Sequence, residues 1–412
     1  MATAAAEGRI VTLDVVRGVA VMGILTVNIV SFAMPEGAGM NPLLYGMNGT
    51  ADLVSWAVSF VFLEGRMRGL FSFLFGASML LVIERAEAAG RSPAPVHYAR
   101  MGWLLVFGLL HFFFVWMGDI LALYALVGMV AFALRDSSRA AMLAMAGAML
   151  VLNFAFYALL TAGLYGTEAM AAQAGASAEM QQAWRESQSG LSHYAPDHLR
   201  SILDLYRGPY DALLYHVATV AQSRLSWELM LAGPETLAYF LFGMAGYRSG
   251  FLTGAWERGR YVRTMLVGFG FALPVFAAFA WLLIATGFHG PTLFAVETFS
   301  IPIRPPAIFA TAALIILLAR PGGFLTGRIA AAGRAAFTNY LGTSILMTGL
   351  FYGWGAGLFG HFSRAQLWWF VAGACLLMLL WSKPWLDRFR YGPFEWAWRS
   401  LARGRIEPLR RA

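Results

Sequence analysis

Long apolar segments alternate with short polar connections along most of the 412-residue chain. A helix rises ~1.5 Å per residue, so about 20 apolar residues cross the ~30 Å hydrocarbon core of a bilayer. Ten segments approach this length: residues 13–34, 67–84, 100–117, 119–134, 140–165, 234–252, 264–287, 296–319, 335–353 and 365–382. The pattern therefore predicts an all-α polytopic membrane protein with about ten transmembrane helices.

The composition agrees with this prediction. Hydrophobic residues make up 59% of the chain and charged residues only 13%, whereas soluble domains have ~25% charged residues. The single cysteine, Cys375, lies in an apolar run and excludes a disulfide framework or a cysteine-ligated metal site. The chain also lacks the phosphate-binding loop, the His-Glu-x-x-His motif and the Gly-x-Ser-x-Gly motif. We expect no metal.

The positive charge is distributed unevenly among the connections. The chain has 30 basic and 22 acidic residues, a net charge of +8. Arginines concentrate in every second connection and in the C-terminal tail, whereas the opposite short loops hold only Arg304 and Arg364. Because cytoplasmic loops are rich in Lys and Arg, both termini are expected in the cytoplasm. This topology accounts for the basicity, so nucleic acid is not an expected partner.

The chain divides into four predicted parts. They are residues 1–165 with helices one to five, an extracytoplasmic or periplasmic segment at 166–233, residues 234–382 with helices six to ten, and a basic aromatic cytoplasmic tail at 383–412. Within the second part, helical patterns lie near 176–187 and 198–206.

Polar residues in the first span share one helix face. At 100° per residue, Arg17 is offset from Asn28 by ~20° and Asp14 by ~40°. Asp14 and Arg17 are expected to form a structural ion pair near the cytoplasmic end. The deeper Asn28 is equally compatible with an active-site role and with a hydrogen bond between helices.

A polar sequence, Glu64-Gly-Arg-Met-Arg-Gly69, interrupts the next apolar run. Its glycines predict a broken helix with backbone groups exposed to a cavity. Arg66 and Arg68 could bind an anionic group, and Ser72 follows Arg68 at helical spacing. The alternatives are a salt bridge with Glu64 and arginines that reach the interface.

His111 is the only histidine expected deep in the membrane, ~16 Å from the start of its span at 1.5 Å per residue. The chain then turns back, which brings Tyr124 to the level of His111. Asp119 is expected to cap the helix after the turn. His111 could be a general base or a hydrogen-bonded structural residue.

Most of the remaining polar residues are expected to have structural roles. Glu235 and Glu297 are near expected helix starts, where carboxylates cap helices. Asn339 opens the ninth span and is kept as a candidate substrate contact. Residues Tyr391–Arg399 predict an aromatic helix at the membrane interface.

Several of these motifs together resemble the YeiB-like family of bacterial inner-membrane proteins, domain of unknown function number 418. They are Leu13–Gly18 with Asn28, Arg68–Gly76, Gly108–His111 with Trp116–Leu121 and Tyr124, Gly333–Ser344, and Tyr391–Arg399. The family is usually placed with transmembrane acyltransferases related to the lysosomal heparan-glucosaminide acetyltransferase. The resemblance implies a multi-pass protein of the bacterial inner membrane and acyl-CoA as co-substrate.

The resemblance carries site residues over only in part. Asp14, Arg17 and Asn28 match the start of the related enzyme's first span, which implies an active-site role for Asn28. The related enzyme has its catalytic histidine eleven residues after the asparagine, where this chain has Gly39. If the chemistry is retained, His111 is the candidate base.

Three functions from different classes follow. The first is an acyltransferase that moves an acyl group from cytosolic acyl-CoA to an extracytoplasmic or lipid-linked acceptor, with His111 and Asn28 catalytic and Arg66, Arg68, Ser72, Asp119, Tyr124 and Asn339 near the substrate. The second is a transporter or lipid-handling protein that binds an anionic substrate at the broken second span. The third is a binding or sensory module built on residues 166–233. Membrane lipid and a small-molecule or glycan acceptor are the expected partners, and a homodimer is compatible with the sequence.

Overall fold

The computed structural model describes residues 10–411, and the regular structure in this range is helical except for two isolated β-bridges. The helices are α1 (Val11–Ala33), η2 (Glu36–Gly39), η3 (Pro42–Leu44), α2 (Thr50–Phe62), α3 (Arg66–Ala88), α4 (Pro93–Phe114), α5 (Leu121–Phe132), α6 (Arg139–Ala171), α7 (Ala178–Ser187), α8 (Pro196–Arg207), α9 (Tyr210–Arg248), α10 (Arg258–Ala285), α11 (Gly290–Ser300), α12 (Arg304–Leu318), α13 (Phe324–Arg334), α14 (Ala336–Phe351), α15 (Leu367–Arg388) and α16 (Pro393–Ala402). The predicted all-α class is confirmed.

Several of these helices can span a membrane. Within residues 10–411, seven helical segments are long and apolar enough, counting α2 and α3 as one, and the pair α11 and α12 adds an eighth if its 59° bend is included in one span. Helices α5 and α14 are only 12 and 16 residues long. Because the sequence-based count of ten includes both of these short helices, that count stays a prediction.

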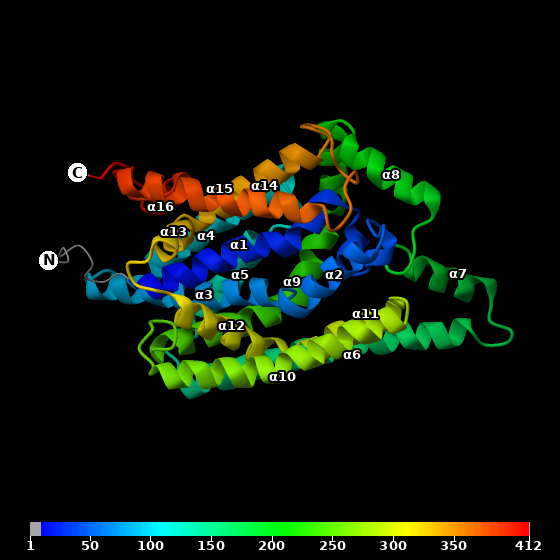
Figure 1. Ribbon diagram of the computed structural model, residues 1–412, viewed down its shortest axis with the longest axis horizontal. Coiled ribbons are helices and arrows are strands. Elements are labelled where there is room, and N and C mark those ends of the chain that lie inside the picture. Colours follow the sequence, from blue (N-terminus) through cyan, green and yellow to red (C-terminus); the bar gives the residue numbers. More distant parts are fainter. Residues whose placement is uncertain (1–9, 412) are drawn as a thin grey trace.

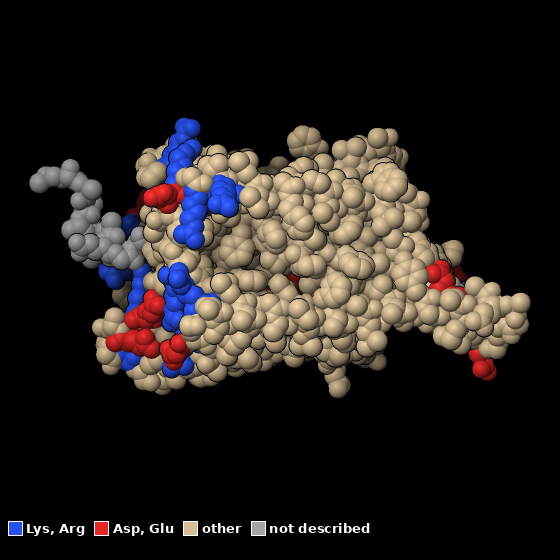
Figure 2. Space-filling model, turned by 90° about the horizontal axis from the view of Figure 1, so that it is seen from below, with Lys and Arg blue, Asp and Glu red and all other residues tan. Residues whose placement is uncertain are grey.

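The molecule is elongated, and its two ends differ in character. Helix α1 begins and α16 ends at one end, whereas α7 and α8 lie at the opposite end (Figure 1). On the face drawn in Figure 2, Lys and Arg gather at the end where α1 begins, and a broad belt beside it has almost no charged surface. A belt of this kind is what a membrane-embedded surface requires.

Helix α9 differs from the sequence prediction. A span was predicted to begin at residue 234, but α9 begins at Tyr210 and continues through Pro234. Proline inside a helix loosens the carbonyls that precede it, and the Asn153 amide of α6 donates to one of these, the Leu231 carbonyl, at 2.8 Å. Asn153 therefore contacts the backbone just before Pro234, and α9 continues across the predicted boundary between residues 233 and 234.

Helix α1 runs through the centre of the bundle and packs against α3, α13, α14 and α15. Two glycines allow its close approach to α13. A Cβ atom on Gly18 would lie 2.1 Å from the Ile329 carbonyl oxygen, and one on Gly333 would lie 1.9 Å from the Asp14 carbonyl oxygen. Arg17 donates to Asp14 at 3.3 Å and to Ser78 of α3 at 2.6 Å.

The aromatic helix α16 docks on α4 and α14. Its buried Glu395 accepts hydrogen bonds from the backbone N–H groups of Phe337 and Thr338, at 2.7 and 3.1 Å, and so caps the N-terminus of α14. Burial raises the pKa of this carboxyl above its ordinary value of 4.5, against the opposing effect of the hydrogen bonds. The Trp398 indole donates to the Arg100 carbonyl of α4 at 2.9 Å. Helix α16 therefore fixes α4 and α14 relative to each other.

Candidate functional site

The turn between α4 and α5 contains a buried histidine–carboxylate pair. His111 Nδ1 lies 2.8 Å from Asp119 Oδ1, and each side chain is only 1% exposed. The other oxygen, Asp119 Oδ2, accepts the Ala122 N–H at 2.8 Å. Asp119 therefore caps α5 and also contacts His111, a second role that sequence reasoning did not foresee.

The contact determines what His111 can do. An ionised carboxylate only accepts hydrogen bonds, so beside an ionised Asp119 a neutral His111 carries its proton on Nδ1 and keeps a lone pair on Nε2. Nε2 is buried and has no hydrogen-bond partner among residues 10–411. A buried polar atom without a partner costs ~1–3 kcal/mol. Such an atom, on an imidazole held in one tautomer, has the properties of a general base awaiting a substrate.

Two aromatic rings flank His111. The Tyr340 ring of α14 lies 5.4 Å from the imidazole between ring centroids, and the Trp116 ring lies 6.3 Å away. The Tyr340 hydroxyl accepts the Ile120 N–H at 3.3 Å, so this tyrosine also supports the turn. Tyr124, which was expected at the level of His111, forms its hydrogen bond with Ser72 of α3 instead.

Tyr340 also lines a pocket between α1, α14 and α15, which we call the α1–α14 pocket. Its lining residues are Val21, Ile24, Leu25, Asn28, Phe32, Asn339, Tyr340, Thr343, Ser344 and Met378. The half-buried Asn28 makes no hydrogen bond among the described residues. The interhelical hydrogen bond considered for Asn28 is therefore not formed among the described residues, and Asn28 lines the pocket.

A second pocket lies next to the α4–α5 turn. It is lined by residues 112–117 at the α4–α5 turn and by Tyr206, Tyr210, Leu213, Leu214, Val217 and Tyr352. Trp116 lines this pocket, and Phe32 of the α1–α14 pocket packs on Trp116 with 4.1 Å between ring centroids. His111 thus contacts one aromatic residue from the lining of each pocket, Trp116 and Tyr340, and itself lines neither.

The predicted substrate-contacting residues of α3 form a separate network. Ser72 and Tyr124 share a hydrogen bond of 2.6 Å, and Ser72 also donates to the Arg68 carbonyl at 3.0 Å. The Arg68 guanidinium pairs with Glu235 of α9. Arg68, Ser72 and Tyr124 are therefore together, but no direct contact joins them to His111.

Glu235 is the centre of a buried charge network. It also accepts from Tyr239 at 2.9 Å and from Arg304 at 3.2 Å, and Arg304 pairs in turn with Glu297. The predicted capping roles of Glu235 and Glu297 are therefore wrong. Glu235 lies deep inside α9, and Glu297 lies in the second half of α11.

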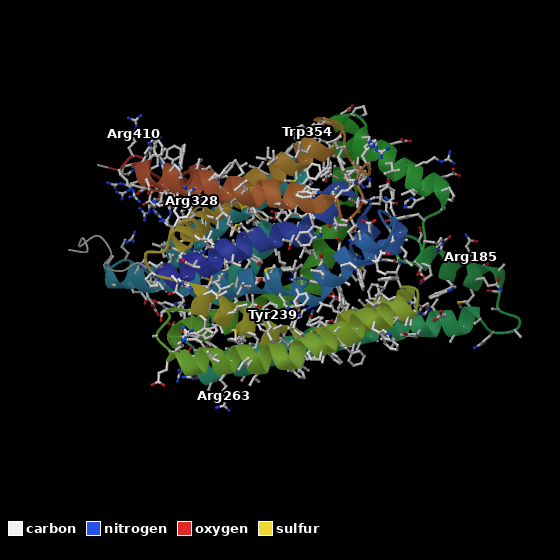
Figure 3. The ribbon with its side chains drawn as sticks, in the orientation of Figure 1. Arg185, Tyr239, Arg263, Arg328, Trp354 and Arg410 are labelled. Carbon is white, nitrogen blue, oxygen red and sulfur yellow. The ribbon has the colours of Figure 1, made fainter. Side chains whose placement is uncertain are left out.

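The network lies in the interior of the bundle. Figure 3 shows Tyr239 between the end that carries Arg410 and the end that carries Arg185. Charges at such a depth are stable only when they are paired, and the network supplies two guanidinium groups for two carboxylates.

Two helix breaks meet at this network. Gly65, between α2 and α3, has φ +67°, and a Cβ atom there would lie 2.5 Å from Arg304 Nε. Arg304 itself follows the bend between α11 and α12. The predicted break of the second span is present, and glycine is required there both for the backbone conformation and for the approach of Arg304.

Arg66 and Asn339 are engaged in structural contacts. Arg66 is 1% exposed, donates to the Val61 and Phe62 carbonyls at the end of α2, and lies over the Phe276 ring. Asn339 donates to the Ala332 carbonyl at 3.0 Å and accepts from the Trp381 indole at 2.9 Å. Arg66 and Arg68 therefore have different partners, since Arg66 binds backbone carbonyls and Arg68 pairs with Glu235.

Sequence reasoning missed Glu228. It lies on α9, is half-buried, interacts electrostatically with both Asp119 and Arg68, and makes no hydrogen bond among the described residues. Glu228 precedes Glu235 by seven residues, so the two share one helix face. This spacing would have been informative if α9 had been predicted to continue through Pro234.

Comparisons with known proteins identify the family. Residues 246–405 match the family described as "Protein of unknown function (DUF418)". The chain is 32% identical over 402 residues to "Uncharacterized protein YeiB" of Escherichia coli (strain K12), covering 95% of this chain and 96% of that protein. The chain belongs to the YeiB-like DUF418 family.

A further relative is "Uncharacterized protein YxaH" of Bacillus subtilis (strain 168), 28% identical over 410 residues, or 97% of this chain and 96% of the relative. No solved structure matches the chain significantly. The family indicated by the sequence motifs is confirmed.

Proposed function

We propose that this DUF418 protein is a membrane acyltransferase, which transfers an acyl group from cytosolic acyl-CoA to an extracytoplasmic or lipid-linked acceptor. In this proposal it is embedded in the bacterial inner membrane with both termini in the cytoplasm. The observation that carries the proposal is the buried His111–Asp119 pair with a free Nε2.

The pair lies at a depth that suits transfer across the membrane. Helix α5 has 12 residues and so covers only ~18 Å of the ~30 Å core. The α4–α5 turn with its histidine is therefore inside the membrane thickness when α5 ends at the cytoplasmic boundary. An acyl donor from one side and an acceptor from the other can meet there.

The residues suggest a simple division of roles. Nε2 of His111 takes the proton from the acceptor hydroxyl or amine as the acceptor attacks the thioester carbonyl. Asp119 stabilises the resulting imidazolium. The unpartnered amide of Asn28 is the candidate donor to the oxyanion. When the tetrahedral intermediate collapses, the carbon–sulfur bond breaks and the proton passes from His111 to the CoA thiolate.

A transfer assay tests the proposal. The full chain in lipid vesicles is mixed with labelled acetyl-CoA and candidate glycan or lipid acceptors, and labelled product is measured. We expect Asn28→Ala to slow transfer by ~10²–10³-fold, as removal of an oxyanion donor does. Absence of transfer to any acceptor, together with unchanged cellular phenotypes of His111→Ala, would contradict the proposal.

One observation favours the transporter as a second candidate. Two broken helices meet at the Glu235 network, and discontinuous helices form substrate sites in many transporters. The arginines at this network disfavour an anionic substrate, because they already have partners. Arg68 and Arg304 are paired with carboxylates, and Arg66 is bound to carbonyls. Solute flux into vesicles without covalent change of the solute would favour this candidate over the enzyme.

A further inference from the structure

Arginines from three helices come together near the end of the molecule where α1 begins. Arg100 of α4 interacts electrostatically with Arg399 of α16 and with Arg403, which follows α16. Arg399 also interacts with Arg17 of α1, and α16 lies at this end of the molecule (Figure 1). Like charges that lie close together repel each other, so the cluster requires carboxylates or another anion.

Carboxylates neutralise only part of this cluster. Arg17 pairs with Asp14 at 3.3 Å, and Arg403 pairs with Glu407 at 2.6 Å. These two arginines therefore have anionic partners within the chain.

Arg100 and Arg399 lack such partners, since their side chains make no hydrogen bond or ion pair among residues 10–411. Glu395 interacts electrostatically with Arg399, but its oxygens accept hydrogen bonds from Phe337 and Thr338 of α14. Both arginines are half-buried, so water and salt screen their repulsion only in part. An external anion would compensate the two charges.

An aromatic ring holds each of these guanidinium groups. Arg100 lies over the Trp398 ring, 4.2 Å from its centroid, and Arg399 lies over the Tyr391 ring at 4.7 Å. The Trp398 indole also donates to the Arg100 carbonyl at 2.9 Å, which holds α16 beside α4. Stacking uses the flat face of a guanidinium and leaves the N–H groups at its edge free to donate.

Phosphate is the anion that best matches two such groups. A guanidinium binds phosphate through parallel N–H···O hydrogen bonds, and a phosphate group has enough charge and acceptor oxygens for two arginines. The end of the molecule that is rich in Lys and Arg borders the uncharged belt (Figure 2). The phosphate can therefore belong to a soluble ester or to a lipid headgroup.

We propose that Arg100 and Arg399 form a phosphate-binding site, which takes the phosphate of a soluble ester such as CoA or of an anionic lipid headgroup. The site does not depend on the acyltransferase proposed above. If its ligand is CoA, the site brings the acyl donor to the end of the molecule where α1 begins.

Two binding measurements on the full chain distinguish these sources of phosphate. In nanodiscs of phosphatidylcholine, the chain is titrated with CoA and with pantetheine, which lacks the phosphates. In detergent, the phosphatidylglycerol that the chain retains is counted by native mass spectrometry. Binding of CoA but not of pantetheine would assign the site to a soluble ester, and retained phosphatidylglycerol would assign it to a lipid, provided that the two arginines are required.

Variants show whether the two arginines are required. Arg100→Gln and Arg399→Gln should each weaken binding by ~10-fold or more, because hydrogen bonds to charged groups contribute that much. Arg100→Lys keeps the charge but loses the planar fork, so it should weaken binding by a smaller factor, and it serves as the test if Arg100→Gln does not fold. The matched control is Arg263→Gln, a change at an exposed arginine of α10, which should leave binding unchanged. Thermal unfolding checks that each variant is folded.

Two results would overturn the proposal. One is a folded original chain that binds neither CoA nor phosphatidylglycerol, and the other is binding that Arg100→Gln and Arg399→Gln weaken no more than Arg263→Gln does. Binding that requires both arginines, without any acyl transfer, would retain the phosphate site and contradict the acyltransferase. Acyl transfer together with binding that is insensitive to both arginines would overturn the phosphate site and leave the acyltransferase intact.

Discussion

At the residue scale, the account depends on one carboxylate with two tasks. Asp119 holds the imidazole of His111 through one oxygen and caps α5 through the other. The sequence allowed the cap to be predicted, because aspartate commonly starts a helix. The contact with His111 could not be predicted, since it depends on how tightly the intervening turn folds.

The two tasks can be separated by mutation. Asparagine caps helices as well as aspartate does, but it does not stabilise an imidazolium by charge. We expect Asp119→Asn to keep the melting temperature within a few degrees of that of the original chain and to lower acyl transfer by ~10²-fold or more. Asp119→Ala should lower both. Equal transfer by the asparagine variant and the original chain would show that Asp119 is only a cap.

The charge network gives a second test at this scale. Glu235 neutralises Arg68 and Arg304 in the interior, so Glu235→Gln leaves buried charge uncompensated. Breaking a buried pair in this way costs ~3–5 kcal/mol, which thermal unfolding in detergent would detect. The matched control is Glu257→Gln, an exposed carboxylate at the start of α10 without a side-chain cap bond. Similar melting temperatures for the two variants would contradict the role of the network.

At the element scale, the breaks in the helices determine where the buried charge network forms. The break at Gly65 could be predicted because glycines flank charged residues within an apolar run. The continuation of α9 through Pro234 could not, because a proline usually ends or kinks a helix, whereas this one lies inside α9. The roles of Glu235 and Glu297 were misjudged because their helices were predicted to begin too late. Both residues lie inside a helix and take part in the charge network, whereas the late starts made them look like helix caps.

The Gly65 break can be tested with a single methyl group. Gly65→Ala adds a Cβ atom at φ +67° and 2.5 Å from Arg304 Nε. We expect a loss of stability of ~1 kcal/mol or more, measured as a lower melting temperature. Gly373→Ala in α15, where a Cβ atom would meet nothing within 4 Å, should leave stability unchanged or raise it. A neutral Gly65→Ala would mean that the break is not constrained.

At the scale of the whole molecule, the distribution of charge along its length favours one orientation. The sequence-based topology predicts α16 in the cytoplasm and α7 outside, and these helices lie at opposite ends of the molecule (Figure 1). The single cysteine, Cys375, can be replaced by serine so that new cysteines report their own side.

We expect a membrane-impermeant maleimide to label Arg185→Cys in intact cells, because α7 faces outward in this topology. Arg410→Cys should be labelled only after the membrane is permeabilised. Labelling of Arg410→Cys in intact cells would reverse the predicted orientation and exclude cytosolic acyl-CoA as a donor from the side of the termini.

The most direct test of the account compares two buried histidines of one helix. His111 has a free Nε2, whereas His97, 2% exposed on the same α4, binds the Gly128 carbonyl through Nε2 at 2.9 Å. The measurement is the rate of labelled acyl transfer by the reconstituted chain, with folding checked by thermal unfolding. The account predicts that His111→Gln loses ~10²-fold or more in rate and that His97→Gln keeps transfer wherever it stays folded. A folded His111→Gln variant that transfers acyl groups at the original rate would contradict it.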